Sequence, residues 1–182
     1  MQDRRQDILE AGLAILREQG LAGLTQPRVA AQTGLRQSHL TYYYPTRADL
    51  LAAVAGAAVD AQLAAAKSVL SKASSPEAAA KRIAAVVVRH DNTRVFAALN
   101  QAADREPAVR AIFNGLLDGF AAELGSFLGK LGHQPSEARI DLLHALFVGL
   151  SIIDLATNRP NSEARARAVL DLTFRLLSGE TP

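Results

Sequence analysis

Apolar residues recur along most of the chain at intervals of three and four, the spacing of one face of an α-helix. The first such stretch runs from about Gln2 to Gln19, and Gly20 ends it as a C-cap glycine would. No segment convincingly shows the strict alternation of a half-buried strand. We therefore predict an all-α fold of about nine helices.

Two short helices follow the first one, and turn residues mark their ends. Thr25 is a good N-cap residue, and Pro27 lies in the first turn, where no backbone donor is needed. Gly34 stops this helix. The next helix opens within residues 36–38 and is broken by Pro45.

A long alanine-rich helix is predicted after Thr46, with Asp49 three residues on in a variant of the capping box. We place a domain boundary at its start, which divides the chain into residues 1–46 and residues 47–182. Further helix starts are predicted at Ser75–Pro76, at Pro107, and within QPSEARIDLL and RPNSEARARAVL.

The two short helices fit a helix-turn-helix unit, in which helices cross closely at a turn containing glycine. Ala30 is small enough for the crossing, and Gly34 tolerates the left-handed turn. Val29, Leu35 and Leu40 supply apolar contacts. Taken alone, this pattern fits either a DNA-binding unit or an ordinary helical hairpin.

All three tyrosines of the chain are adjacent, at the end of the second short helix. Successive helical residues point about 100° apart, so the three rings cannot all face one core. Tyr44 follows Leu40 by four residues and is predicted to point inward, while Tyr42 and Tyr43 point outward. No acid occurs in residues 19–48. The segment therefore suits a DNA backbone, although a tyrosine cluster that buries a helix corner is the alternative.

Composition limits the remaining possibilities. The 182 residues contain no cysteine, which excludes disulfides, thiolate metal sites and a cysteine nucleophile. The net charge of +2 is too small for nonspecific nucleic-acid binding by the whole molecule. The longest apolar run, Ala145 to Ile153, is about half of the roughly 20 residues that a bilayer requires. We expect a soluble, cytoplasmic protein without membrane contact.

The stretches ILEAGLAILREQGLAGLT and VAAQTGLRQSHLTYYYPTRADLL resemble the N-terminal part of TetR-type (tetracycline-repressor-like) transcriptional regulators. The resemblance covers about the first quarter of the chain. It implies a three-helix DNA-binding head, a linking fourth helix, and a helical body that binds a small molecule and forms a homodimer. The expected function is a ligand-responsive regulator, most simply a repressor that a small molecule releases from a palindromic operator. The alternative is a helical binding or scaffold protein with an unused head.

The resemblance also assigns contacts with the DNA backbone. Thr25 and Gln26 would meet phosphate at the start of the second helix, and Tyr42 and Tyr43 would flank the backbone. Arg47 stands where the family usually has a phosphate-binding lysine.

Base contacts are assigned to the start of the third helix. Gln37, Ser38 and His39 would face base edges. Thr41 stands where the family usually has a tyrosine, which puts one customary contact in doubt, and Arg28 is either a base contact or a solvated charge. The full predicted DNA-binding set is Thr25, Gln26, Arg28, Arg36, Gln37, Ser38, His39, Thr41, Tyr42, Tyr43 and Arg47.

Two apolar stripes near the C-terminus are the predicted dimer interface, because the resemblance places a four-helix contact there. Their helical spacing and small residues suit close packing between helices, although such a stripe can equally be plain core. The predicted interface residues are Leu142, Ala145, Leu146, Gly149, Leu150, Ile153, Val169, Leu172 and Leu176.

The effector site is predicted only loosely, from the stretch VVVRHDNTRVFAALN and from later phenylalanines that suit an apolar pocket or a plain core. Neither the effector nor its polarity can be read from the sequence. The candidate ligand contacts are His90, Asn92, Arg94, Phe96, Phe113 and Phe120.

Candidate catalytic chemistry is sparse. Asp141 and His144 have the i, i+3 spacing of helical di-metal sites, but such a site needs a second copy and more glutamates. His90 with Asp91 could form a polar pair, yet no nucleophile or set of metal ligands accompanies it. We predict no catalysis, no metal and no cofactor.

Overall fold

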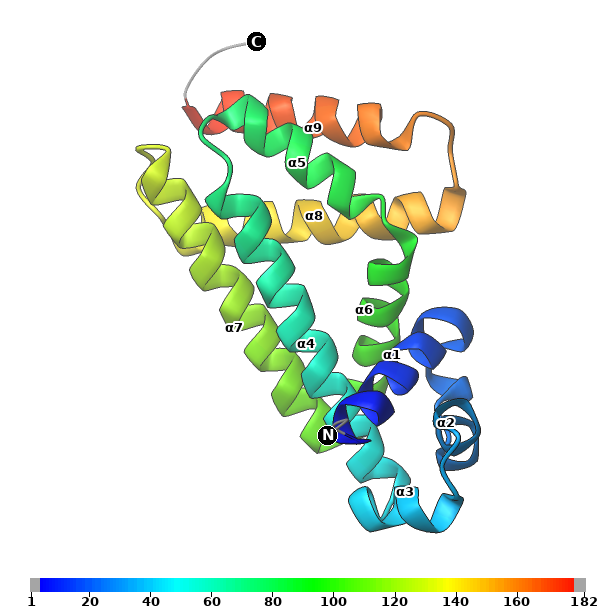
Figure 1. The fold of residues 1–182 in the computed structure, drawn as a ribbon. Helices are drawn as coiled ribbons and strands as arrows, with labels where there is room; N and C mark the ends of the chain where they lie inside the picture. The colour runs from blue at the N-terminus through cyan, green and yellow to red at the C-terminus, as the bar shows by residue number, and fades with distance from the viewer. Residues whose placement is uncertain (1–3, 179–182) are drawn as a thin grey trace. The chain divides into compact units, whose positions relative to one another are not determined.

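A computed structural model describes residues 4–178, and over that range it contains nine α-helices and no strand (Figure 1). The all-α prediction is confirmed. The helices are α1 (Arg4–Gly23), α2 (Gln26–Thr33), α3 (Gln37–Tyr43), α4 (Arg47–Ser71), α5 (Pro76–Val87), α6 (His90–Ala103), α7 (Pro107–Lys130), α8 (Glu137–Thr157) and α9 (Ser162–Ser178).

The chain forms two compact units, which we describe separately. Unit 1 combines Met1–Gln62 with Arg94–Leu116, and unit 2 combines Leu63–Thr93 with Leu117–Pro182. Unit 1 therefore contains the predicted head together with the first part of α4, most of α6 and the start of α7.

Helix α1 contains the expected break. Gly20 has φ 66° and ψ −166°, which interrupts the helical backbone before a last turn that ends at Gly23. Glycine adopts this conformation without the steric cost of a Cβ atom. The predicted start at Gln2 lies outside the described residues.

The turn between α2 and α3 has the geometry expected of a glycine C-cap. Gly34 has φ 68°, and its N–H donates to the carbonyl groups of Ala30 and Ala31. The Leu35 N–H donates to the same Ala30 carbonyl over 2.9 Å. Thr25 is the N-cap residue of α2, but its side chain makes no capping hydrogen bond.

Helix α4 begins with the predicted capping box. The Asp49 carboxylate accepts from the Thr46 N–H over 2.9 Å, and the Asp49 N–H donates to the Thr46 hydroxyl over 3.0 Å. Two backbone donors at the start of α4 that lack a partner within the helix are thus satisfied.

The core of unit 1 holds α1 against α4. Ile8, Ile15 and Leu16 of α1 are buried, as is Val54 of α4. A Cβ atom added at Gly12 would lie 2.5 Å from Val54 Cγ2, so the missing side chain allows this close approach.

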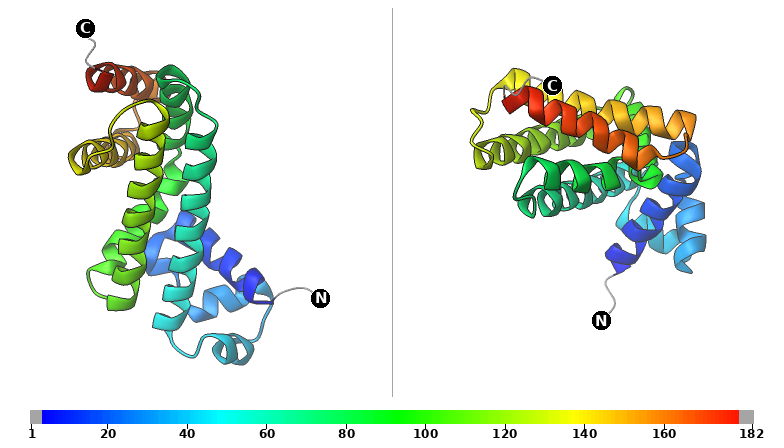
Figure 2. Two further views of the ribbon diagram at one scale, coloured as in Figure 1. Left: turned by 90° about the vertical axis from the view of Figure 1, so that its left-hand side faces the viewer. Right: turned by 90° about the horizontal axis from the view of Figure 1, so that it is seen from above.

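In unit 2, α5 and α9 lie side by side, as the views in Figure 1 and Figure 2 both show. Phe127 of α7 and Phe174 of α9 meet edge to face at 5.8 Å within this core. Ser75 and Ser136 cap α5 and α8 with side-chain hydrogen bonds, at the predicted starts. Asn158 ends α8 in a left-handed conformation.

Gly12→Ala should destabilise the protein by about 1–3 kcal/mol, because Val54 is stiff at its branched Cβ and the helices must shift. Urea unfolding measures the change. Gly115→Ala is the matched control: no atom lies within 4 Å of an added Cβ, and the helix should gain up to about 1 kcal/mol. Equal effects of the two variants would refute the packing role of Gly12.

Candidate nucleic-acid interface

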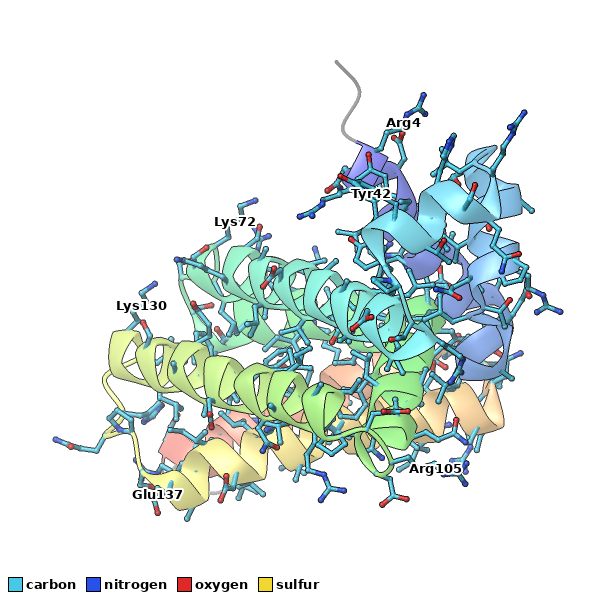
Figure 3. All side chains as sticks on the ribbon, turned by 90° about the horizontal axis from the view of Figure 1, so that it is seen from below. Arg4, Tyr42, Lys72, Arg105, Lys130 and Glu137 are labelled. Atoms are coloured by element: carbon cyan, nitrogen blue, oxygen red, sulfur yellow. The ribbon has the colours of Figure 1, made fainter. Side chains whose placement is uncertain are left out.

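The outer flank of α3 is open to solvent. Leu40 on its inner side is fully buried, whereas Gln37, Ser38 and His39 are exposed. Tyr42 is 82% exposed, and Figure 3 shows its side chain at the surface. One apolar residue therefore anchors the helix and leaves a row of hydrogen-bonding side chains free to meet a partner.

The three tyrosines differ in exposure. Tyr42 is exposed, while Tyr43 and Tyr44 are both half-buried. The rings of Tyr42 and Tyr43 meet edge to face with centroids 5.4 Å apart, and the Arg5 guanidinium lies 6.0 Å from the Tyr43 centroid. Tyr43 thus points outward less freely than Tyr42, because α1 covers part of its ring.

Gln26 links the start of α2 to the end of α3. Its amide nitrogen donates to the Tyr44 carbonyl over 2.7 Å and to the Pro45 carbonyl over 3.3 Å. This side chain was expected at a phosphate, but its donor group is used within the head.

Arg47 has a similar internal role at the start of α4. Its Nε donates to the Leu24 carbonyl and its Nη2 to the Leu21 carbonyl, each over 3.3 Å. These carbonyls follow the Gly20 break, so Arg47 ties α4 to the last turn of α1. Its phosphate contact stays a prediction.

Two other predicted contacts also have partners inside the head. The Arg28 guanidinium donates to Gln19 over 2.6 Å, although both residues are exposed. The Thr41 hydroxyl donates to the carbonyl groups of Gln37 and Ser38, each over 3.1 Å. The Thr41 hydroxyl is therefore already used within α3, at the position where the resemblance leads us to expect a tyrosine.

The predicted effector residues are divided between the two units. In unit 2, His90 pairs with Asp154 of α8 at 3.0 Å, a partner that the sequence did not indicate. A hydrogen bond from Ser162 contributes most to lowering the pKa of Asp154, and His90 adds to it. Asn92 is half-buried and Arg94 is exposed.

The three phenylalanines form two separate aromatic pairs. Phe96 and Phe113 meet at 5.2 Å in unit 1, and Phe120 stacks on His144 at 5.7 Å in unit 2. Burial lowers the pKa of His144, while the nearby charge of Asp141 acts in the opposite direction. Burial therefore favours the neutral form of the His144 ring that stacks on Phe120.

Unit 1 contains a cavity of about 250 Å³ that sequence reasoning missed. None of the six predicted ligand residues lines it, because it is formed by segments far apart in the sequence. Its walls are Leu21, Ala22, Arg47, Leu51, Gln101, Ala102, Arg105 and Glu106.

Within residues 4–178, no group of three or more His, Cys, Asp or Glu side chains could hold a metal ion. The His144 ring instead stacks on Phe120.

Helices α8 and α9 of unit 2 carry an exposed apolar face. Of the predicted interface residues, Leu146 and Leu150 pack partly against the core. Gly149 leaves open space around its Cα, and Ala145 is exposed. Ile152, outside the predicted set, is also 38% exposed. The other predicted residues have exposed fractions of 51% for Leu142, 53% for Ile153, 37% for Val169, 41% for Leu172 and 57% for Leu176.

Two helices, α4 and α8, are long and apolar enough to cross a membrane by length and composition alone. The expectation that no segment has this length is therefore wrong, because it considered only uninterrupted apolar runs. Part of α4 is buried, as in a core helix, but only 6% of the apolar window of α8 is buried. Most of the apolar window of α8 is therefore exposed.

Two family models match the chain. Residues 8–54 match "Bacterial regulatory proteins, tetR family", and residues 74–176 match "Tetracyclin repressor-like, C-terminal domain". The second match alone spans more than half of the chain. The protein belongs to the TetR family of transcriptional regulators, with a helix-turn-helix head and a ligand-binding C-terminal domain.

Solved structures agree with this assignment. A transcriptional regulator from Rhodococcus sp. Rha1 is 21% identical with a TM-score of 0.83, covering 99% of this chain and all of that one. A TetR-family member from Streptomyces coelicolor A3 is 28% identical, with a TM-score of 0.71 and coverage of 94% and 98%. The multidrug binding protein EbrR complexed with proflavin is 26% identical, with a TM-score of 0.67 and coverage of 94% and 99%. No curated protein matches significantly.

Stability should fall as the pH drops below 6.5, because the unfolded chain then takes up a proton that folded His144 resists. His144→Phe should remove this part of the pH dependence, measured by thermal unfolding between pH 7 and pH 5. His133→Phe is the control, at a histidine outside the aromatic pair. If His144→Phe leaves the pH profile unchanged, His144 is not held neutral by burial.

Proposed function

We propose that the protein is a homodimeric repressor that reads a palindromic DNA operator with α3 and leaves it when a small molecule binds the C-terminal domain. The observation that carries this proposal is the outer flank of α3, which is exposed and free of acid while Leu40 anchors the opposite side. A flank of this kind can enter the major groove, where base edges present distinct patterns of donors and acceptors.

Within this proposal, some exposed residues contact base edges and others contact the DNA backbone. Gln37, Ser38 and His39 meet base edges, since they lie at the exposed start of α3. Tyr42 meets the backbone, together with Arg36, which is exposed at the N-cap of α3.

The remaining residues of the predicted set act mainly through the geometry of the head. Gln26 and Arg47 hold the ends of α3 and α1 through backbone carbonyls, so their effect on DNA is positional. Thr25 and Arg28 lie at the start of α2, and Arg28 can exchange its exposed contact with Gln19 for a phosphate. Tyr43 contacts the Tyr42 ring edge to face.

The homodimer is supported by the exposed apolar face on α8 and α9. Leu142, Ile153 and Leu176 are each more than half exposed, and burying such side chains against a second copy is favourable. A two-fold dimer presents two recognition helices, which fit half-sites about 34–36 Å apart on one side of the duplex.

The effector is proposed to be a small molecule that stacks on aromatic rings in the C-terminal domain. EbrR, 26% identical, has been crystallised with proflavin and with ethidium. In this chain, Phe120 and the neutral ring of His144 form a stacked pair that suits an aromatic ligand. Release from DNA requires that the ligand prefer the non-binding state, and typical couplings are about 1–3 kcal/mol.

Selection from random duplexes followed by sequencing tests the function. We expect enrichment of a palindrome, because a two-fold dimer reads two equal half-sites. Gln37→Ala and His39→Ala should relax preference at particular base pairs, each contact being worth about 1–3 kcal/mol, whereas the control Gln134→Ala on an exposed loop should not. Absence of any enriched sequence would favour the scaffold alternative.

Proflavin titrated into the complex with the selected duplex then tests whether a small molecule releases the protein from DNA.

The dimer has its own test. Leu142→Glu combined with Leu176→Glu should give a folded monomer, because two charges would enter the apolar face, and operator binding should weaken at least tenfold. Sedimentation measures the mass, and circular dichroism confirms the helices. Ala122→Glu, at an exposed site on α7, should remain dimeric. A double variant that stays dimeric would rule out this interface.

A further inference from the structure

The cavity of unit 1 is formed by three segments that are far apart in the sequence. The last turn of α1 supplies Leu21 and Ala22, the start of α4 supplies Arg47 and Leu51, and the end of α6 with the following turn supplies the side chains from residues 101–106. Its volume is about 250 Å³. Since an apolar cavity of about 150 Å³ is already large enough for benzene, this one has room for a small ring or chain with a polar substituent.

Hydrogen bonds hold the turn between α6 and α7 in place. Arg110 donates from Nε to the Ala103 carbonyl over 2.9 Å and from Nη2 to the Asp104 carbonyl over 3.1 Å. The N–H groups of residues 105–106 both donate to the Ala102 carbonyl, over 3.0 and 2.9 Å. This wall of the cavity is therefore preformed, and a ligand would not have to order it.

The opposite wall is held by Arg47. Its Nε and Nη2 donate to the carbonyls of Leu24 and Leu21, and the Leu24 N–H donates to the Leu21 carbonyl over 3.3 Å. These bonds tie the start of α4 to the last turn of α1. They also fix the positive charge of the Arg47 guanidinium beside the cavity that it lines.

Apolar side chains form part of the lining. Leu51 and Ala102 are only 1% and 2% exposed, and Leu21 is half-buried. Placing the carbon atoms of a ligand against such side chains is favourable, because it removes apolar surface from water. Small-molecule sites typically combine a lining of this kind with a few polar groups that select the ligand.

The charged side chains of the lining favour an anion. Arg47 and Arg105 are positively charged and Glu106 is negatively charged, which leaves one net positive charge. Within residues 4–178, the Arg105 guanidinium has no hydrogen bond or ion pair, and Figure 3 shows this side chain at the surface, after the end of α6. A planar guanidinium with available donors matches the two oxygens of a carboxylate.

We infer that the unit 1 cavity is a second small-molecule site, which takes a small organic carboxylate. The Arg105 guanidinium donates to both carboxylate oxygens, the fixed charge of Arg47 adds to the attraction, and the apolar part of the ligand lies against the leucine side chains of α1 and α4. This site is distinct from the stacked pair of Phe120 and His144, which belongs to unit 2.

Titration of the full-length protein with sodium benzoate, and separately with sodium hexanoate, tests the site through amide chemical shifts. We expect saturable shifts in residues 21–24 and 101–106, with a dissociation constant of about 1 mM for ligands of this size. Benzamide has nearly the same shape without the charge and should bind about tenfold more weakly. Sodium chloride at equal ionic strength is the control for general effects of salt.

Two variants test the recognition separately from the fold. Arg105→Ala should weaken benzoate binding about tenfold, whereas Arg17→Ala, which removes the same charge from an exposed position of α1 outside the cavity, should leave it unchanged. Ala22→Phe should abolish binding of benzoate and benzamide alike, because the added ring occupies part of the cavity. Thermal unfolding shows that each variant remains folded.

Three results would overturn the inference. One is the absence of saturable shifts in these two segments with either carboxylate at about 10 mM, tenfold above the expected dissociation constant. Another is equal binding of benzamide and benzoate, and the third is an equal effect of Arg105→Ala and Arg17→Ala. None of these measurements uses DNA, so their failure leaves the proposed function standing, and failure of the operator selection leaves this site standing.

Discussion

The burial of Leu40 is the contact on which the rest of the head depends. This side chain is fully buried at the centre of α3, a helix of only seven residues. A helix this short is not stable by itself in water, so packing of one face must hold it. The left-handed backbone of Gly34 directs α3 into that position, and everything on the opposite flank remains exposed.

Side chains that could have met DNA instead fix the ends of this short helix. Gln26 donates to the carbonyl of Tyr44 at its end, and the Thr46–Asp49 capping box starts α4 directly afterwards. Arg47 ties α4 to the end of α1. Some of the polar side chains of this segment thus set the geometry of the head.

Local signals in the sequence predicted the helices well. Contacts between residues far apart in the sequence could not be predicted. Caps such as Ser75 and Gly34 act within one turn, so the sequence located them. The start of α6 at His90 was not located, since neither glycine nor proline separates it from α5. The pairing of His90 with Asp154, 64 residues away, and the position of Arg5 on Tyr43 depend on packing that no local pattern encodes. The exposed flank of α3 was predictable because helical geometry alone prevents three adjacent tyrosines from facing one core.

Amide hydrogen exchange of the full-length protein, with and without its selected duplex, tests the central claim most directly. Our account predicts that DNA slows exchange mainly in α3 and at the N-terminal end of α2, where backbone and side chains would lie against the duplex. Unchanged exchange in residues 36–43, with protection elsewhere in a complex of full affinity, would contradict the claim that α3 is the surface that reads DNA.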